Sequence, residues 1–203
     1  METTADRGFL VLADISGFTA FVTETELEHG SAIIGALLEA VMVGLAPPLE
    51  IQEVEGDAIF AVGADSRLAG AGALLDALDG AFAGFRERRR QLAGDESCAC
   101  GACRRTAQLD LKIVAHHGRF LRHAVGGRSR VAGASVIVAH RLLKNGVGRR
   151  AGYVLLTEDA VDALGVDPAV AGLEPHTEAY EHLGAIRCFV GAPSRASLVH
   201  AGD

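Results

Sequence analysis

An apolar run that ends on a carboxylate is the feature that most constrains how this chain can fold. The segment GFLVLADISGFTAF, residues 8–21, passes from consecutive apolar residues into Asp14 and changes to helical spacing after a Gly-Phe-Thr turn. This pattern predicts a buried strand at residues 9–13 that leads directly into a helix. An aspartate at such a junction can cap the helix, and it also suits a site for something positive or for a group that carries phosphate.

The remaining elements are predicted from periodicity and turn residues. We expect helices at residues 18–29 and 31–45 with a break near Gly30, a hairpin over 49–63 that turns at Glu55-Gly56-Asp57, a helix over 66–92, a cysteine-containing loop at 93–106, two strands within 109–125 that break at Gly118, a helix over 133–146 with Gly146 as its stop, and strands at 153–157 and 185–191. Hairpin-linked strands with helices between them are typical of an α+β fold. We therefore predict one domain over residues 1–203, with a mixed or largely antiparallel sheet and helices packed on one face.

Composition and charge narrow the partners and the location. The 203 residues are 49% hydrophobic, and the formal charge is -7 with a pI near 5.6. An acidic chain is a poor partner for nucleic acid or an anionic membrane. The start METTADRG lacks the pattern of a secretory signal, and residues 31–49, the most apolar stretch, contain Glu39 and end at Pro47-Pro48. We therefore expect a cytoplasmic protein that binds neither nucleic acid nor membrane, with residues 31–49 as a core helix.

Asp14 and Asp57 are more informative as a pair than singly. Each alone is explained by helix capping or by turn chemistry. Asp14 ends the first predicted strand and Asp57 begins a strand of the predicted hairpin, so the two carboxylates lie side by side if these strands are neighbours. Adjacent carboxylates repel unless a cation holds them, and their oxygens suit Mg²⁺ that also binds phosphate and water. The following turn offers backbone N–H groups to an anion.

Three of the four cysteines, Cys98, Cys100 and Cys103, are clustered in CACGAC. Without a secretory signal, we expect reduced thiols. Three thiolates in one short loop are candidate ligands for Zn²⁺, which takes sulfur and nitrogen ligands in a tetrahedron. The candidates for a fourth ligand are His116, His117, Cys188 and the same loop of another subunit. A redox role and incidental loop cysteines are the alternatives.

Four segments resemble, in the same order, the signatures of class III nucleotidyl cyclase catalytic domains. They are FLVLADISGFTAF, EVEGDAIFAVG, LKIVAHHGRF and GASVIVAHRLL, and they cover most of residues 9–143. The chain resembles even more closely a subgroup of stand-alone cyclase-like proteins, the domain of unknown function DUF2652. It shares with them the segments ADISGFTAFV, ELEH, EGDA and AHRLLKN and the cysteine cluster. The resemblance implies the ferredoxin-like cyclase fold, a nucleoside triphosphate bound with Mg²⁺ or Mn²⁺, and a head-to-tail homodimer.

The resemblance also implies a metal and phosphate half of a site. Asp14 and Asp57 match the two metal-binding aspartates, and Ile15 matches the residue whose carbonyl joins them. The phosphate-holding turn is matched by Gly17, Phe18 and Thr19.

The second half of the implied site reads the base and stabilises the transferring phosphate. Glu53 and Arg130 fall at the base-reading positions, and a carboxylate at position 53 could accept hydrogen bonds from guanine. Arg141 matches the arginine that stabilises the phosphate during transfer.

This second half departs from the pattern of active cyclases. Ile137 replaces an asparagine that holds the ribose, and Arg130 replaces an aspartate or cysteine. Active cyclases also carry a phosphate-binding lysine near the last strand, and it has no clear match here; Glu181 and His182 are nearby in the sequence. Lys144, one helical turn after Arg141, could supply a substitute positive charge. Each lost donor costs on the order of 10²–10³ in rate. We therefore expect metal-dependent purine nucleotide binding with cyclase activity weak, altered or absent. The alternatives are a non-catalytic dimeric nucleotide sensor and a zinc- or redox-responsive regulator that uses the cysteine cluster.

Overall fold

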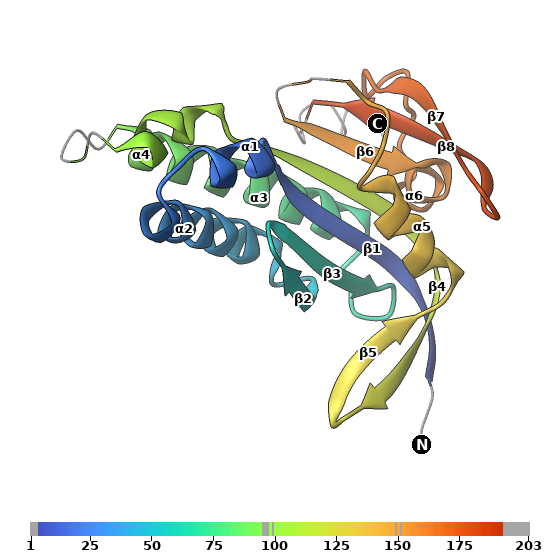
Figure 1. Ribbon diagram of the computed structural model, residues 1–203. Helices are drawn as coiled ribbons and strands as arrows, with labels where there is room; N and C mark the ends of the chain where they lie inside the picture. Colours follow the sequence, from blue (N-terminus) through green and yellow to red (C-terminus); the bar gives the residue numbers. More distant parts are fainter. Residues whose placement is uncertain (1–3, 95–97, 99, 149, 151, 193–203) are drawn as a thin grey trace.

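One eight-stranded sheet organises the protein, as the computed structural model shows for residues 4–94, 98, 100–148, 150 and 152–192 (Figure 1). Its strands are β1 (Thr4–Ser16), β2 (Glu50–Glu55), β3 (Ala58–Ala64), β4 (Asp110–Val125), β5 (Arg128–Ala132), β6 (Tyr153–Thr157), β7 (Glu174–Tyr180) and β8 (Gly184–Gly191). Their order is β2-β3-β1-β4-β6-β8-β7, with β5 paired to β4 outside this path. Strands β4 and β6 are parallel and the other described pairs are antiparallel. The predicted α+β class with a mostly antiparallel sheet is confirmed.

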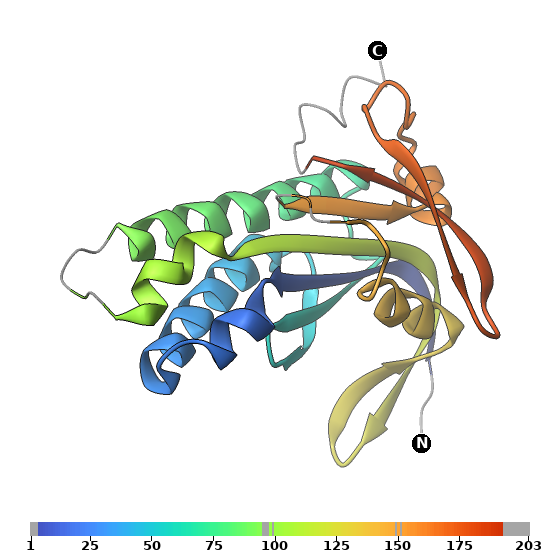
Figure 2. The ribbon, with the colours of Figure 1, turned by 45° about the horizontal axis from the view of Figure 1, so that its top comes forward.

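Most helices cover one face of this sheet. They are α1 (Phe18–Thr23), α2 (Leu27–Leu45), α3 (Ala71–Ala93), α4 (Gly101–Arg105), α5 (Ala134–Leu142) and α6 (Glu158–Leu164), with a 3-10 turn at Thr106–Gln108. Alternate residues of β1 face opposite sides: Val11 and Ala13 join the core beneath α2, α3 and α6, whereas Leu10 and Leu12 are buried with Ala139 of α5. Helix α5 is therefore the exception to the predicted one-sided packing, and Figure 2 shows it across the sheet from α2 and α3.

Helix α2 is long and apolar enough to cross a membrane by length and composition alone, a test that core helices of globular proteins also pass. In the fold its residues Leu37, Val41 and Leu45 are buried in the main core. Gly44 lies so close to α3 that an added Cβ would be 2.3 Å from the backbone nitrogen of Ala81. This packing supports the expected core helix, which ends before the two prolines.

Two glycines that predicted breaks instead lie inside elements. Gly30 is buried within α2, and the break between α1 and α2 falls at residues 24–26. Gly118 lies inside β4, which continues to a reversal at Gly126-Gly127, where both glycines have positive φ. The missing side chain of Gly118 permits close packing, because an added Cβ would lie 2.2 Å from the Oγ of Ser135 in α5.

Other boundaries also differ from the prediction. Helix α3 begins at Ala71 rather than at residue 66, and α5 ends at Leu142 rather than near Gly146. The side-chain amide of Asn145 donates to the carbonyl of Leu142 at 2.7 Å and so caps this helix end. Helix α6 and edge strand β7 were not predicted. Within the expected cysteine loop, residues 101–105 form α4, while residues 95–97 and 99 lie outside the described part.

Candidate functional site

The pairing of β1 with β3 brings Asp14 and Asp57 together. Asp14 is opposite Ala58 in the register, and the N–H of Ile15 donates to the carbonyl of Asp57 at 3.2 Å. Partial burial, and then the neighbouring Asp14 carboxylate, raise the pKa of Asp57 to about 6. The two carboxylates therefore repel each other, which is the condition under which a divalent cation stabilises such a pair.

A lysine that the sequence analysis did not single out already neutralises part of this charge. Lys112 lies opposite Asp14 in the β1–β4 register, and its Nζ is 2.8 Å from Oδ2 of Asp14. The same ammonium donates to the carbonyl of Leu143 at 2.9 Å. The available signal was a single lysine within an apolar strand, LKIVA, next to the strand that carries Asp14. Asp14, Asp57 and Lys112 together carry a net charge of about -1 when both aspartates are ionised.

The predicted phosphate turn lies at the end of β1. Gly17 has φ +89°, a left-handed conformation that favours glycine, and it precedes the first residue of α1. Phe18 packs partly against the core, and the carbonyl of Thr19 accepts a hydrogen bond from the hydroxyl of Thr23 at 2.9 Å. The first N–H groups of a helix have no intrahelical acceptor, so this turn has backbone donors available.

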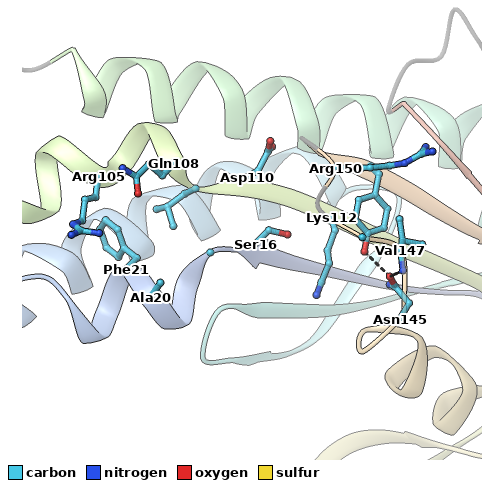
Figure 3. A pocket seen from close by; sticks show the side chains of 14 residues that line it. Ser16, Ala20, Phe21, Arg105, Gln108, Asp110, Lys112, Asn145, Val147 and Arg150 are labelled. Atoms are coloured by element: carbon cyan, nitrogen blue, oxygen red, sulfur yellow. Dashed lines mark hydrogen bonds between the residues drawn. The ribbon is translucent and has the colours of Figure 1, made fainter.

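A cavity of about 820 Å³ opens beside this turn (Figure 3). Three cationic side chains from different elements line it: Arg105 of α4, Lys112 of β4 and Arg150 of the segment before β6. Figure 3 shows Arg105 near Phe21, with Lys112 and Arg150 toward the other end. Arg105 pairs with Glu24 and Arg150 pairs with Glu174, so carboxylates outside the cavity lining hold both arginines. This arrangement suits an extended polyanion.

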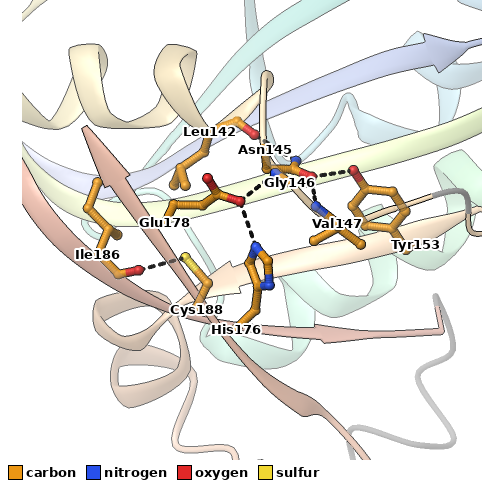
Figure 4. Close-up of polar contacts among 9 residues, drawn as sticks. All are labelled: Leu142, Asn145, Gly146, Val147, Tyr153, His176, Glu178, Ile186 and Cys188. Carbon is orange, nitrogen blue, oxygen red and sulfur yellow. Dashed lines mark hydrogen bonds and ion pairs between the residues drawn. The ribbon is translucent and has the colours of Figure 1, made fainter. Parts of the chain in front are cut away.

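Hydrogen bonds around Asn145 fix one wall of the cavity (Figure 4). Its side-chain oxygen accepts from the hydroxyl of Tyr153 at 2.8 Å and from the N–H of Val147 at 3.1 Å. The next residue, Gly146, donates its N–H to Glu178 of β7, which also contacts Nε2 of His176 at 2.6 Å. Burial raises the pKa of Tyr153, so this hydroxyl stays protonated as a donor. Glu178 belongs to the strand that the sequence analysis missed.

The predicted catalytic arginine, Arg141, makes no hydrogen bond or ion pair with the aspartate pair in the described part of the chain. Arg141 is an exposed residue near the end of α5, and it is absent from the described lining of the cavity. Burial raises the pKa of Tyr180, the last residue of β7, to about 12, and the positive charge of Arg141 opposes this rise. Arg141 therefore lies near the end of β7. Ile137, one helical turn earlier, is 53% exposed. Ile137 is therefore one of the exposed large apolar side chains of the described chain.

The two predicted base-reading residues contact each other. Nη1 of Arg130 in β5 lies 2.9 Å from Oε1 of Glu53 in β2, and both side chains are about two-fifths exposed, at 41% and 43%. A base that contacts either residue must therefore compete with this ion pair. Neither residue is in the described lining of the cavity beside Gly17, and Glu53 instead lines a small pocket together with Ala58, the residue that follows Asp57.

The cysteines form a cluster with a histidine that was not among the expected ligands. Cys98, Cys100 and Cys103 gather around His29 of α2, and all four ligand atoms lie within 4.8 Å of one another. A hydrogen bond from the backbone N–H of Cys103 lowers the pKa of the Cys100 thiol to about 7. Burial raises the pKa of the Cys103 thiol to about 12. The available signal for His29 was the segment ELEH, which the DUF2652 subgroup shares together with the cysteine cluster.

The three expected partners within the chain lie elsewhere. His116 contacts the hydroxyl of Thr157 at 3.0 Å, and His117 contacts the carboxylate of Asp65 at 3.1 Å. Cys188 is buried and its thiol faces the carbonyl of Ile186 at 3.7 Å. These choices of fourth ligand were wrong because β4 and β8 lie in the sheet, whereas the cysteines gather at the start of α2.

Comparisons with known proteins match this architecture. Residues 34–151 match the family described as a protein of unknown function, DUF2652. An uncharacterised protein of Mycobacterium tuberculosis (strain ATCC 25618 / H37Rv) is 32% identical over 151 residues, which are 73% of this chain and 68% of that protein.

Solved cyclase structures have the same fold. The adenylyl cyclase CyaB from P. aeruginosa is similar with a TM-score of 0.71 at 17% identity, over 98% of this chain and 100% of that chain. A guanylyl cyclase gives a TM-score of 0.73 at 15% identity, over 96% of each chain. The guanylate cyclase domain of Catenaria anguillulae in complex with GTP gives 0.64 at 14% identity, over 94% of this chain and 97% of that domain.

Proposed function

Because the chain belongs to the DUF2652 family and has the fold of nucleotidyl cyclase catalytic domains, we propose that it binds a purine nucleoside triphosphate together with a divalent cation. Cyclase activity in this proposal is weak, altered or absent. The observation that carries it is the aspartate pair, Asp14 and Asp57, which Lys112 links to the cavity: Lys112 contacts Asp14 and lines the cavity, although the aspartates themselves are not in its described lining.

The residues present fit a divalent cation. Besides burial, the Asp14 carboxylate helps to raise the pKa of Asp57, and Mg²⁺ or Mn²⁺ would stabilise such a pair of carboxylates; the carbonyl of Ile15 is the third oxygen that the resemblance implies for this site. The cation would neutralise phosphate charge and activate an attacking hydroxyl. Lys112 already holds Asp14, so its ammonium must shift toward the phosphates or share the carboxylate when the cation binds.

The cavity suits the triphosphate by size and charge. Its volume of about 820 Å³ lies in the range of small-molecule sites. Arg105, Lys112 and Arg150 place three cationic groups in the lining, although each is paired with a carboxylate and Asp110 also lines the cavity. A triphosphate would compete with these carboxylates for the cations, and the turn at Gly17 adds backbone N–H donors. Tyr153 and Asn145 add polar groups to the lining.

A second copy of the chain would complete the site. Arg141 and the Glu53–Arg130 pair are not in the described lining of the cavity beside Gly17, and in this proposal a second copy supplies them to the ligand. A head-to-tail homodimer, as the resemblance implies, would bring Arg141 and the base-reading residues of one copy to the aspartates of the other.

The loss of a hydrogen-bond donor at position 137 leads us to expect slow cyclisation. Cyclisation requires the ribose 3′-hydroxyl to attack the α-phosphate while pyrophosphate leaves, and the attacking oxygen loses its proton. Ile137 offers no hydrogen bond to the ribose or to the transferring group. Loss of one such donor lowers the rate on the order of 10²–10³, so substrate binding is expected to exceed turnover as the measurable property.

The test is binding and turnover measured in parallel on the same protein. Purified protein is incubated with ATP, GTP, CTP or UTP and Mg²⁺ or Mn²⁺, and nucleotide binding, pyrophosphate and cyclic product are followed. We expect purine triphosphate binding that requires the cation and is lost in Asp57→Asn, which keeps the side-chain shape. Binding that persists without the cation or in Asp57→Asn would overturn the proposal.

A non-catalytic nucleotide sensor is the second candidate, favoured by two observations. Ile137 is exposed at the position where cyclases hold the ribose, and Arg130 occupies Glu53 through an ion pair. This candidate predicts cation-dependent binding, or a change in dimer population, with no pyrophosphate release. Pyrophosphate and cyclic product in stoichiometric amounts that disappear in Asp57→Asn would favour the enzyme.

A further inference from the structure

We propose that His29, Cys98, Cys100 and Cys103 form a zinc site that fastens α4 to the start of α2. Figure 1 and Figure 2 both place α4 beside the beginning of α2, on the helical side of the molecule. The site lies apart from the aspartate pair, and its existence does not depend on nucleotide binding.

The spacing of the four ligand atoms suits tetrahedral zinc. A zinc ion with Zn–S bonds of about 2.3 Å and a Zn–N bond of about 2.0–2.1 Å separates its ligand atoms by roughly 3.5–3.8 Å. Nδ1 of His29 lies 3.2 Å from Sγ of Cys100, 3.6 Å from Sγ of Cys98 and 3.9 Å from Sγ of Cys103. A small adjustment of each side chain therefore brings all four atoms to zinc-ligand distance.

The ligand chemistry selects zinc among the common ions. Three thiolates and one imidazole are soft and borderline ligands, whereas Mg²⁺ and Ca²⁺ prefer oxygen. A set of four protein ligands leaves no open position, which is typical of a structural site. The imidazole binds through unprotonated Nδ1, so its proton resides on Nε2.

Backbone contacts hold the ligand loop in place around this centre. The N–H of Cys103 donates to Sγ of Cys100 at 3.4 Å, a bond that stabilises a thiolate. The carboxylate of Glu26, which directly precedes α2, accepts from the N–H of Gly101 at 3.0 Å and of Ala102 at 3.1 Å. These contacts orient the ligands from outside the first coordination sphere, as supporting groups do at metal sites.

The site also connects to the cavity, and this step rests on the proposed function. Helix α4 ends at Arg105, which lines the cavity and pairs with Glu24 in the segment between α1 and α2. Ala102 of α4 is fully buried, so the helix is anchored on its core side as well. Zinc that fastens Cys100 and Cys103 would thus hold Arg105 in the position where it meets an anion.

The test measures metal content in the full chain under reducing conditions. The protein is purified, stripped with chelator and reloaded with Zn²⁺ or Co²⁺, and bound metal is counted. We expect one zinc ion per chain, and a cobalt form whose visible spectrum shows thiolate charge transfer and tetrahedral coordination. Absence of stoichiometric zinc, or an octahedral cobalt spectrum without thiolate bands, would overturn the proposal.

Variants separate this site from incidental cysteines. Cys100→Ser should abolish stoichiometric zinc, and His29→Ala should weaken its affinity by at least about tenfold. Cys188→Ala is the matched control, because Cys188 is a buried cysteine outside the cluster, and it should retain zinc. Full zinc affinity in His29→Ala, or a disulfide within CACGAC that blocks alkylation of the native protein, would contradict the site.

The connection to the cavity has a separate readout. Removing zinc should weaken triphosphate binding severalfold in the wild type but not in Arg105→Ala, which has already lost the cavity charge. If zinc binds and its removal leaves triphosphate affinity unchanged in a protein that binds triphosphate, the link fails while the zinc site stands. If zinc binds and triphosphate does not bind at all, the proposed function fails instead.

Discussion

At the scale of single residues, Lys112 determines how the aspartate pair behaves without a metal. Its ammonium contacts Asp14 with side chains only 20% and 17% exposed, so this ion pair is screened less than a surface pair. This internal cation lowers the repulsion between the carboxylates, and it would compete with the proposed divalent ion for the same oxygen. Lys112 is therefore expected to influence both stability and metal affinity.

Replacing Lys112 should separate these two effects. Lys112→Met should lower the free energy of unfolding by about 1–3 kcal/mol, because it leaves a largely buried carboxylate without its cationic partner. The same variant should bind Mn²⁺ more tightly in the absence of nucleotide and triphosphate less tightly. Denaturant titration and metal titration check both, with Lys112→Arg as the control that keeps the charge. Unchanged metal affinity in Lys112→Met would argue against competition at Asp14.

Asp57 should make stability depend on pH. Its pKa is about 6 in the folded protein against 3.8 for an ordinary aspartate in the unfolded chain, so the folded state binds more protons between these pH values. Stability should therefore fall as pH rises from about 4 to 6 and then level off, by about 1–2 kcal/mol after allowance for solvent screening. Mg²⁺ should reverse the trend, since it binds the ionised pair. Unfolding followed at several pH values, with Asp57→Asn as the control that should lack this dependence, checks the sign.

The placement of Asp14 beside Asp57 and of the turn at Gly17 could be predicted at the residue scale, because one local pattern of strand, aspartate and Gly-Phe-Thr leads to it. Lys112 could not, since its role arises only when β4 pairs with β1 across about a hundred residues of sequence. His29 was not predicted as a ligand for the same reason: its contacts come from a loop about 70 residues later in the sequence.

At the scale of elements, the contact between α5 and the sheet depends on Gly118. The sequence analysis interpreted this glycine as a turn, because a glycine between apolar runs is a common break. Its actual role is visible only once α5 lies over β4, where no side chain fits beneath Ser135. Strand β7 was missed because its alternating polar residues are those of a sheet edge, without an apolar run. Long periodic elements such as α2 and α3 were predictable, and their ends were less so.

Gly118→Ala should therefore destabilise the protein by about 1–3 kcal/mol through overpacking, although alanine is otherwise well suited to ordered backbone. Gly35→Ala is the matched control: no atom lies within 4 Å of an added Cβ there, and helix propensity should make it neutral or stabilising by up to about 1 kcal/mol. Thermal or denaturant unfolding measures both. Equal stability of the two variants would mean that α5 moves away from β4 without cost.

At the scale of the whole molecule, the separated halves of the site predict complementation between copies. Asp57→Asn and Arg141→Ala should each lose high-affinity cation-dependent triphosphate binding. In a head-to-tail dimer formed from both variants, one site combines the intact Asp57 with the intact Arg141, so mixing should restore at most about a quarter of the sites. Nucleotide-binding stoichiometry on the co-refolded mixture checks this. Loss in the single variants without recovery on mixing would contradict the shared site.

The central place of β1 has a consequence for how the protein is made. The strand is synthesised early, yet residues 4–16 find one neighbour only when residues 110–122 of β4 have followed. Until then the apolar run from Phe9 to Ala13 has an open edge toward β4 and is exposed to pairing with other chains. A ribosome that stalls before β4 would therefore release an aggregation-prone fragment, and a nascent chain of this family should need a chaperone over that interval more than after it.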